Sequence, residues 1–145
     1  MTRAEPGARW VLLVDDDDTV VETMSAVLKD DGYTVLVAIC GDHAWTMLQV
    51  HAPPPDVVLL DLVMPNGDGW SVVDRLKSDP RLARIPLVVM SGHGRDLFPT
   101  VPDAEAHLPK PFDPGRLLET MRTVLTRRGC PRTIRPAPAA APGEP

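Results

Sequence analysis

Residues 10–18 read WVLLVDDDD, an unbroken apolar run that ends in four consecutive aspartates. An apolar run without polar alternation is typical of a parallel strand that helices cover on both faces. Two neighbouring carboxylates about 4 Å apart repel by about 1 kcal/mol in water and by about 4 kcal/mol at an effective dielectric constant of about 20. We therefore expect a buried strand whose end holds a cation.

Apolar runs of the same kind recur along the chain, bounded by turn residues. The predicted strands cover residues 10–14, 33–39, 56–60, 86–90 and, more weakly, 106–108. Apolar residues with helical spacing lie between these runs and after the last one. This alternation predicts an α/β fold with a five-stranded parallel sheet and helices on both faces.

The helix expected between the fourth and fifth strands is short or broken. Pro99 and Pro102 lie in this segment. A proline inside a helix costs about 3 kcal/mol, because it lacks an N–H group and clashes with the preceding turn. At most a short turn fits near residues 95–98.

The length and composition predict one domain with a tail. The 145 residues are 43% hydrophobic and 24% charged, which suits one buried core and is too short for two ordinary domains. We expect an N-terminal extension over residues 1–9, a domain over residues 10–128 and a Pro/Ala-rich tail over residues 129–145. The tail has hardly any large apolar residues, so we expect it to be disordered.

Charge and hydropathy restrict the expected partners and location. The net charge of −5 disfavours broad binding to nucleic acid or anionic lipid, so no direct DNA binding is expected. No run approaches the length of about 18 apolar residues that a membrane-spanning helix needs. The first ten residues also lack the apolar segment of a secretory signal. We expect a cytoplasmic protein that does not enter a membrane.

Polar residues follow four of the predicted strands. Asp15 to Asp18 follow the first, Asp61 the third, Ser91 the fourth and Lys110 the fifth. Because the carboxyl ends of parallel strands meet at one edge, these side chains are expected to form a binding site there. Carboxylates, a hydroxyl and an amine suit Mg²⁺ and a phosphoryl group. Asp17 and Asp18 fit equally well as the cap and first turn of a helix.

The order of the motifs resembles the receiver domain of response regulators in two-component signal transduction. The motifs are VLLVDDD, PDVVLLDLVMPNGDGW, LVVMSG and HLPKPF, and together they extend over nearly all of residues 10–128. The resemblance implies a flavodoxin-like, doubly wound sheet with the strand order 2-1-3-4-5. It also implies a phosphoacceptor domain that is a signalling module and not an enzyme, with Mg²⁺ as its cofactor.

The resemblance implies a role for each acidic residue of the site. Asp61 matches the aspartate that accepts a phosphoryl group from the phosphohistidine of a sensor histidine kinase or a histidine phosphotransfer protein. Asp16 matches a direct Mg²⁺ ligand, and Asp15 matches the residue that holds the water shell of the metal. Val63 matches the residue whose backbone carbonyl completes the metal site.

Further positions match the switch of the family. Ser91 matches the hydroxyl that bonds a phosphoryl oxygen, and Lys110 matches the amine that pairs with the phosphoryl charge. His107 stands where the family usually has tyrosine or phenylalanine. Since imidazole titrates near neutral pH, we hypothesise a pH-sensitive switch at this position. Val63 and His93 match positions that influence the lifetime of the phosphoryl group.

Two alternatives stay open at this point. Asp15, Asp17 and Thr19 fit the D-x-D-x-T motif of haloacid-dehalogenase-like phosphohydrolases, although that interpretation leaves Asp61 and MPNGDG unexplained and lacks an acidic strand end after Lys110. A pseudo-receiver would keep the fold as a binding module without phosphorylation.

The expected function is that of a stand-alone receiver in a phosphorelay. Its output would be contact with an unidentified downstream protein, or passage of the phosphoryl group to a phosphotransfer partner. In the family, the surface around the fourth helix carries dimer contacts. Because Pro99 and Pro102 interrupt that helix, we expect a monomer in the unphosphorylated state.

Overall fold

Five strands alternate with four helices in the computed structural model, which describes residues 9–51, 53–64, 68–91, 104–110 and 113–127. The strands are β1 (Trp10–Val14), β2 (Thr34–Ala38), β3 (Val57–Asp61), β4 (Leu87–Ser91) and β5 (Ala106–Pro109). The helices are α1 (Asp18–Asp30), α2 (Gly41–Val50), α3 (Asp68–Ser78) and α4 (Pro114–Arg127).

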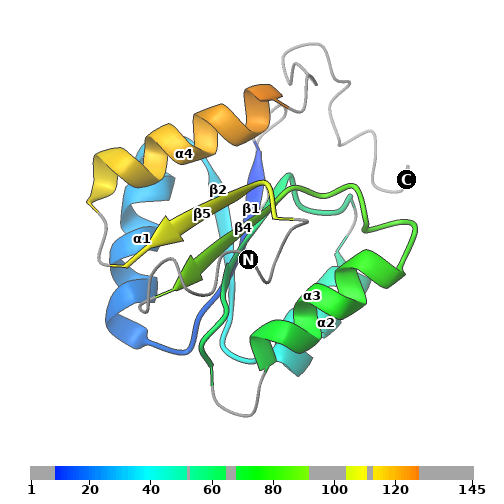
Figure 1. Ribbon diagram of the computed structural model, residues 1–145. Helices are drawn as coiled ribbons and strands as arrows, with labels where there is room; N and C mark the ends of the chain where they lie inside the picture. The colour runs from blue at the N-terminus through cyan, green and yellow to red at the C-terminus, as the bar shows by residue number, and fades with distance from the viewer. Residues whose placement is uncertain (1–8, 52, 65–67, 92–103, 111–112, 128–145) are drawn as a thin grey trace.

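The strands form one parallel sheet in the order β2-β1-β3-β4-β5. Helices α1 and α4 lie on one face of this sheet, and α2 and α3 lie on the other (Figure 1). The doubly wound α/β fold with the order 2-1-3-4-5 is therefore confirmed. All five predicted strands agree with the observed ones to within a residue at each end, but Asp61 and Ser91 are the last residues of β3 and β4 and do not follow them.

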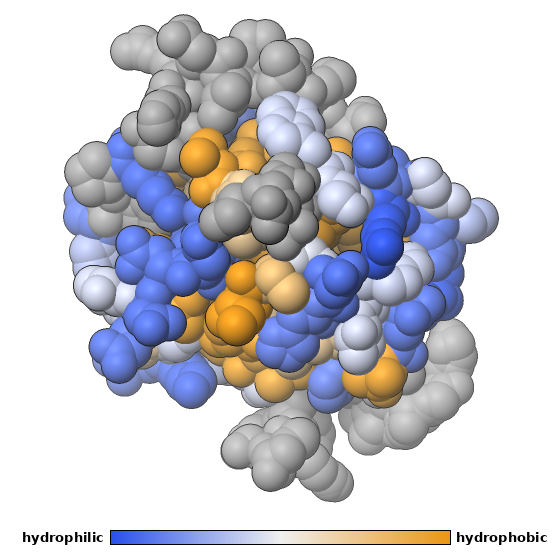
Figure 2. Space-filling model, turned by 90° about the horizontal axis from the view of Figure 1, so that it is seen from below, coloured by the Kyte–Doolittle hydropathy of each residue, from blue (hydrophilic) through white to orange (hydrophobic). Residues whose placement is uncertain are grey.

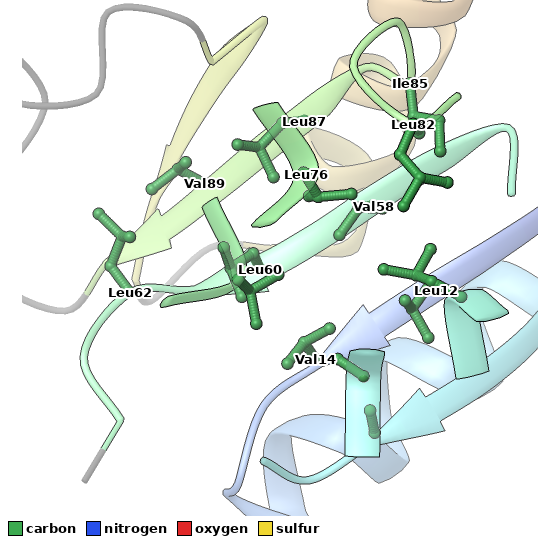
Figure 3. Close-up of a cluster of buried hydrophobic side chains, with 14 of the residues drawn as sticks. Leu12, Val14, Val58, Leu60, Leu62, Leu76, Leu82, Ile85, Leu87 and Val89 are labelled. Carbon is green, nitrogen blue, oxygen red and sulfur yellow. The ribbon is translucent and has the colours of Figure 1, made fainter. Parts of the chain in front are cut away.

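The core has two layers because successive residues of a strand point to opposite faces of the sheet. On β1, Leu12 and Val14 pack with α2 and α3, whereas Val11 and Leu13 pack with α1 and α4. Figure 3 shows the first of these layers, in which side chains from β1, β3 and β4 meet those of α3. Strands buried on both faces explain why the sequence runs are apolar throughout.

The first helix is held at both ends by local interactions. The side chain of Asp17 accepts hydrogen bonds from the backbone N–H groups of Thr19 (2.9 Å) and Val20 (3.2 Å), so the interpretation of Asp17 as a helix cap is confirmed. After the helix, Gly32 has a φ of 98°, a conformation that glycine adopts at little cost. These ends fix where β1 passes into α1 and where α1 passes into β2.

The surface of the domain is chemically mixed. Hydrophobic groups lie among hydrophilic ones on the face seen from below (Figure 2). Large apolar side chains with substantial exposure are Ile39, Val50, Val63 and Trp70. Scattered exposure of this kind is normal for a folded domain. Within the described ranges, no helix has the length and apolar character needed to cross a membrane.

Several sequence predictions concern residues outside the described ranges. They are the short or broken helix around Pro99 and Pro102, the position of His93, the extension over residues 1–8 and the tail over residues 129–145.

The two-layer core generates a stability prediction. Leu12 lies in the central part of the sheet and is fully buried, so Leu12→Ala is expected to lower the free energy of unfolding by about 2–5 kcal/mol through lost burial and a cavity. Val50 ends α2 and is 67% exposed, so Val50→Ala should change it by less than about 0.5 kcal/mol. Urea unfolding followed by circular dichroism measures both. Equal losses in the two variants would contradict this account of the core.

Candidate functional site

The register of the sheet brings the predicted site residues to one edge. Val14 pairs with Leu60, and Ser91 pairs with Pro109. Asp15, Asp61 and Lys110 therefore leave the sheet at nearby levels on three different strands. Pairing continues past the strand ends, because the N–H groups of Asp15 and Leu62 donate to the carbonyls of Ala38 and Met90, both at 3.1 Å. The loops that carry the site thus start from fixed positions.

Asp15 is held rigidly below the surface of this edge. Its side chain is fully buried. One carboxylate oxygen, Oδ2, accepts a hydrogen bond from Nζ of Lys110 at 2.9 Å, and the other, Oδ1, accepts one from the N–H of Asp17 at 3.0 Å. Both oxygens of Asp15 therefore have protein donors.

Asp61 shares the same amine. The residue is only 4% exposed, and its Oδ2 accepts from Nζ of Lys110 at 3.4 Å. Its Oδ1 accepts from the N–H of Val63 at 2.9 Å. Burial, followed by the negative charge of Asp15, raises the pKa of Asp61 from 3.8 to about 6, against the opposing effect of Lys110. The carboxylate of Asp61 is thus incompletely neutralised by its surroundings.

Lys110 stays charged between these two carboxylates. Burial acts to lower the pKa of its ammonium group, but the hydrogen bond and charge of Asp15, together with the charge of Asp61, outweigh burial and raise it above 10.5. The shorter of its two contacts is the one to Asp15. One ammonium group therefore serves two buried carboxylates, which leaves excess negative charge in the site.

A third carboxylate completes an acidic cluster. Asp15, Asp16 and Asp61 each offer one oxygen, and these atoms lie within 4.8 Å of one another. Asp16 is exposed, whereas Asp15 and Asp61 are buried. Carboxylate oxygens are ligands that Mg²⁺ prefers, usually one or two of them with water and phosphate oxygens in the remaining positions. The donor set and the excess negative charge fit a divalent cation.

Three further sequence-predicted residues lie on, or just after, strands that end at this edge of the sheet. Val63 follows β3 and is 48% exposed. Ser91 ends β4 beside Pro109, the residue before Lys110. His107 is half-buried in β5 opposite Val89. Because partners on parallel strands point to the same face, it lies on the side of α2 and α3.

Two backbone donors of the site were not predicted from the sequence. The N–H of Asp17 holds Asp15, and the N–H of Val63 holds Asp61; in both cases the donor lies two residues after the aspartate. An aspartate at a strand end often bonds the backbone two residues on, in an Asx-turn. That local signal was present in the sequence at both positions.

Comparison with known proteins gives a family match for most of the chain. The model of the response regulator receiver domain matches residues 11–122. Response regulator Rre1 of Synechocystis sp. is 34% identical over 122 residues, which cover 81% of this chain and 52% of that protein. The DNA-binding dual master transcriptional regulator RpaA of the same organism is 32% identical over 121 residues, which cover 81% of this chain and 49% of that protein.

The fold agrees with solved structures as well. The crystal structure of a putative response regulator from Chloroflexus aurantiacus is similar with a TM-score of 0.75 and 29% identity, covering 83% of this chain and 99% of that one. The chain spans about half the length of the curated relatives it matches. The shared region is thus the domain that carries the acidic cluster.

The raised pKa of Asp61 generates a prediction for the protein without metal. Because the folded-state pKa lies above the unfolded one, the stability that Asp61 contributes is full below about pH 4 and is lost as the pH rises through about 6. Removing the charge with Asp61→Asn should therefore raise the free energy of unfolding at about pH 7 to 8 by about 1–3 kcal/mol, and this gain should vanish below about pH 4.

Urea unfolding in a metal chelator at several pH values measures this difference. Asp74→Asn, at an exposed acid of α3, serves as the control and should change the stability by less than about 0.5 kcal/mol at any pH. A loss of stability in Asp61→Asn at neutral pH would show that the carboxylate is satisfied without a metal.

Proposed function

Because the chain belongs to the response regulator receiver domain family, we propose that it accepts a phosphoryl group on Asp61 with the help of Mg²⁺. The observation that carries this proposal is the position of Lys110, whose Nζ lies 2.9 Å from Asp15 and 3.4 Å from Asp61. An amine shared in this way lies beside the acceptor carboxylate and can neutralise charge that a phosphoryl group brings to it.

The reaction is the transfer of a phosphoryl group from a phosphohistidine of a sensor histidine kinase or a histidine phosphotransfer protein. An oxygen of Asp61 forms a bond to phosphorus as the phosphorus–nitrogen bond breaks, and the electron pair of that bond returns to the imidazole. Oδ1 accepts from the N–H of Val63 at 2.9 Å, whereas Oδ2 has the longer contact, 3.4 Å, to Nζ of Lys110, so Oδ2 is the better placed nucleophile. Lys110 stabilises the negative charge on the phosphoryl oxygens in the transition state.

The metal site is proposed to consist of Asp15, Asp16, Asp61 and the backbone carbonyl of Val63. Asp16 is exposed and can bind the metal directly, whereas both oxygens of Asp15 already accept hydrogen bonds. Asp15 therefore suits the role of holding the water shell of the ion. Bound Mg²⁺ supplies positive charge that offsets the repulsion between the carboxylates and the incoming phosphoryl group.

The switch is proposed to use Ser91 and His107, and the phosphoryl lifetime to depend on Val63 and His93. Ser91 ends β4 next to the strand that carries His107, so a bond between its hydroxyl and the phosphoryl group would act on the neighbouring strand. A conformational response to phosphorylation that is the same at about pH 5.5 and about pH 8 would rule out a pH-sensitive role of His107.

The partners are proposed to be proteins. The acceptor domain, proposed to cover residues 10–128, would meet a sensor kinase or phosphotransfer protein, and its output would be contact with an unidentified downstream protein. RpaA is described as DNA-binding, but the net charge of −5 of this chain supports the proposal that the domain itself does not bind DNA. We further propose a monomer before phosphorylation and a cytoplasmic location.

The phosphohydrolase and the pseudo-receiver are not equally compatible with these observations. Domains of this family are signalling phosphoacceptors and not classical enzymes, which speaks against the phosphohydrolase. The carboxylate of Asp17, which that alternative needs, caps α1. The pseudo-receiver differs from our proposal only in its lack of phosphorylation, so a phosphorylation experiment separates the two.

The central prediction is a covalent phosphoryl group on Asp61. Incubation with acetyl phosphate and Mg²⁺ should add the mass of one phosphoryl group in an acid-labile form, and omission of Mg²⁺ should reduce this gain by at least about tenfold. Intact-protein mass spectrometry measures the gain. Asp61→Ala should abolish it, whereas Asp74→Ala, at an exposed acid of α3, should leave it unchanged.

Other results would favour the alternatives. A gain that survives Asp61→Ala and disappears in Asp15→Ala would point to the phosphohydrolase. A chain that binds Mg²⁺ but never gains mass would be a pseudo-receiver.

A further inference from the structure

Gly69 packs directly against the backbone that follows Asp61. It is the second residue of α3 and is buried. A Cβ atom at this position would lie 2.7 Å from each of three backbone atoms, the carbonyl oxygen of Asp61 and the Cα and carbonyl oxygen of Leu62. Non-bonded carbon atoms normally lie about 3.5–4.0 Å apart, and Cβ atoms essentially never lie closer than 3.0 Å to a carbon or an oxygen of another residue. The first turn of α3 can therefore lie where it does only because residue 69 has no side chain.

The backbone that Gly69 touches also orients Asp61. The carbonyl group of Leu62 and the N–H group of Val63 belong to one planar peptide unit, so they move together. This N–H donates to Oδ1 of Asp61 at 2.9 Å. A group that displaces the carbonyl of Leu62 therefore turns the N–H of Val63 away from the carboxylate.

We propose that Gly69 is a positioning residue for Asp61. By allowing α3 to rest on the peptide between Leu62 and Val63, it fixes the hydrogen bond that holds Oδ1 and leaves Oδ2 facing Lys110. The consequence for phosphoryl transfer rests on the proposed function. The expected weakening of the hydrogen bond from Val63 to Asp61 is independent of that function.

Replacement of Gly69 by alanine adds only one methyl group, but its effect on the rate of phosphorylation should be large. An acceptor displaced by about 1 Å from its productive position can slow a reaction by about 100-fold. We expect Gly69→Ala to lower the maximal rate of phosphorylation by about 10- to 100-fold, with little change in the concentration of acetyl phosphate that gives half the maximal rate, since the substitution moves the acceptor and does not touch the phosphodonor.

The chain offers a matched control. Gly115 is the second residue of α4, as Gly69 is of α3. A Cβ atom at residue 115 would meet Oδ1 of Asp113 at 3.4 Å and nothing closer. Gly115→Ala therefore makes the same chemical change at the same place in a helix without pressing on the backbone near Asp61.

The experiment follows phosphorylation and the N–H of Val63 in the full chain. In Gly69→Ala, the amide proton of Val63 should shift upfield and exchange faster with solvent in NMR spectra recorded without phosphodonor, because its hydrogen bond is weakened. The maximal rate of phosphorylation should fall by about 10- to 100-fold. Gly115→Ala should resemble the wild type in both measurements. A general loss of packing would instead change amide signals throughout the sheet.

A second variant tests the same link if Gly69→Ala does not fold. Incorporation of the α-hydroxy acid analogue of valine at position 63 replaces the N–H by an ester oxygen and keeps the carbonyl and the side chain. Because Val63 is exposed, this change disturbs packing little. It should reduce the maximal rate of phosphorylation at least about tenfold, since one of the groups that orient Asp61 is removed.

Three results would overturn the proposal. The first is a Gly69→Ala protein with an unchanged Val63 amide signal and rate, the second is an equal effect of Gly115→Ala, and the third is an ester variant that is phosphorylated at the wild-type rate. A wild-type chain that takes up no phosphoryl group would refute the proposed function, and the amide signal of Val63 would still decide whether Gly69 positions Asp61.

Discussion

The ion pairs of Lys110 with Asp15 and Asp61 are the interactions on which the site depends. They join β5, β1 and β3 at one edge of the sheet, at 2.9 and 3.4 Å. A buried carboxylate without a partner is strongly destabilising, and one ammonium group cannot fully neutralise two buried carboxylates with Asp16 beside them. The raised pKa of Asp61 is consistent with this incomplete neutralisation of its charge. A site with this excess of negative charge is suited to a divalent cation.

The doubly wound sheet makes such a site possible. Buried strands such as β1 and β3 are covered on both faces, so the strand ends that carry Asp15 and Asp61 are fixed by two layers of packing. Crowded carboxylates can be held together only if the frame that carries them resists separation. The apolar runs in the sequence therefore specify the fold and also provide the rigidity that the acidic cluster needs.

Most of the fold could be predicted from the sequence, because the faces of strands and helices are encoded in the spacing of apolar residues. The same logic placed Asp15, Asp61 and Lys110 at one edge, since the ends of parallel strands converge. The hydrogen bond from Val63 and the close approach of Gly69 were not predicted. The first could have been inferred from an aspartate at a strand end, which often forms an Asx-turn. The second depends on distances between backbone atoms, about which side-chain patterns carry little information. The predicted break at Pro99 and Pro102 lies outside the described residues.

Metal binding at the acidic cluster is the most direct test of this account. Mn²⁺ favours carboxylate oxygens as Mg²⁺ does, and it broadens the NMR signals of nuclei near it. On titration of the wild type with Mn²⁺, the account predicts selective broadening of backbone signals around Asp15, Asp16 and Asp61, reversed by excess Mg²⁺ and lost in Asp16→Asn. Broadening centred elsewhere, or unchanged in that variant, would contradict the claim that these carboxylates form a divalent cation site.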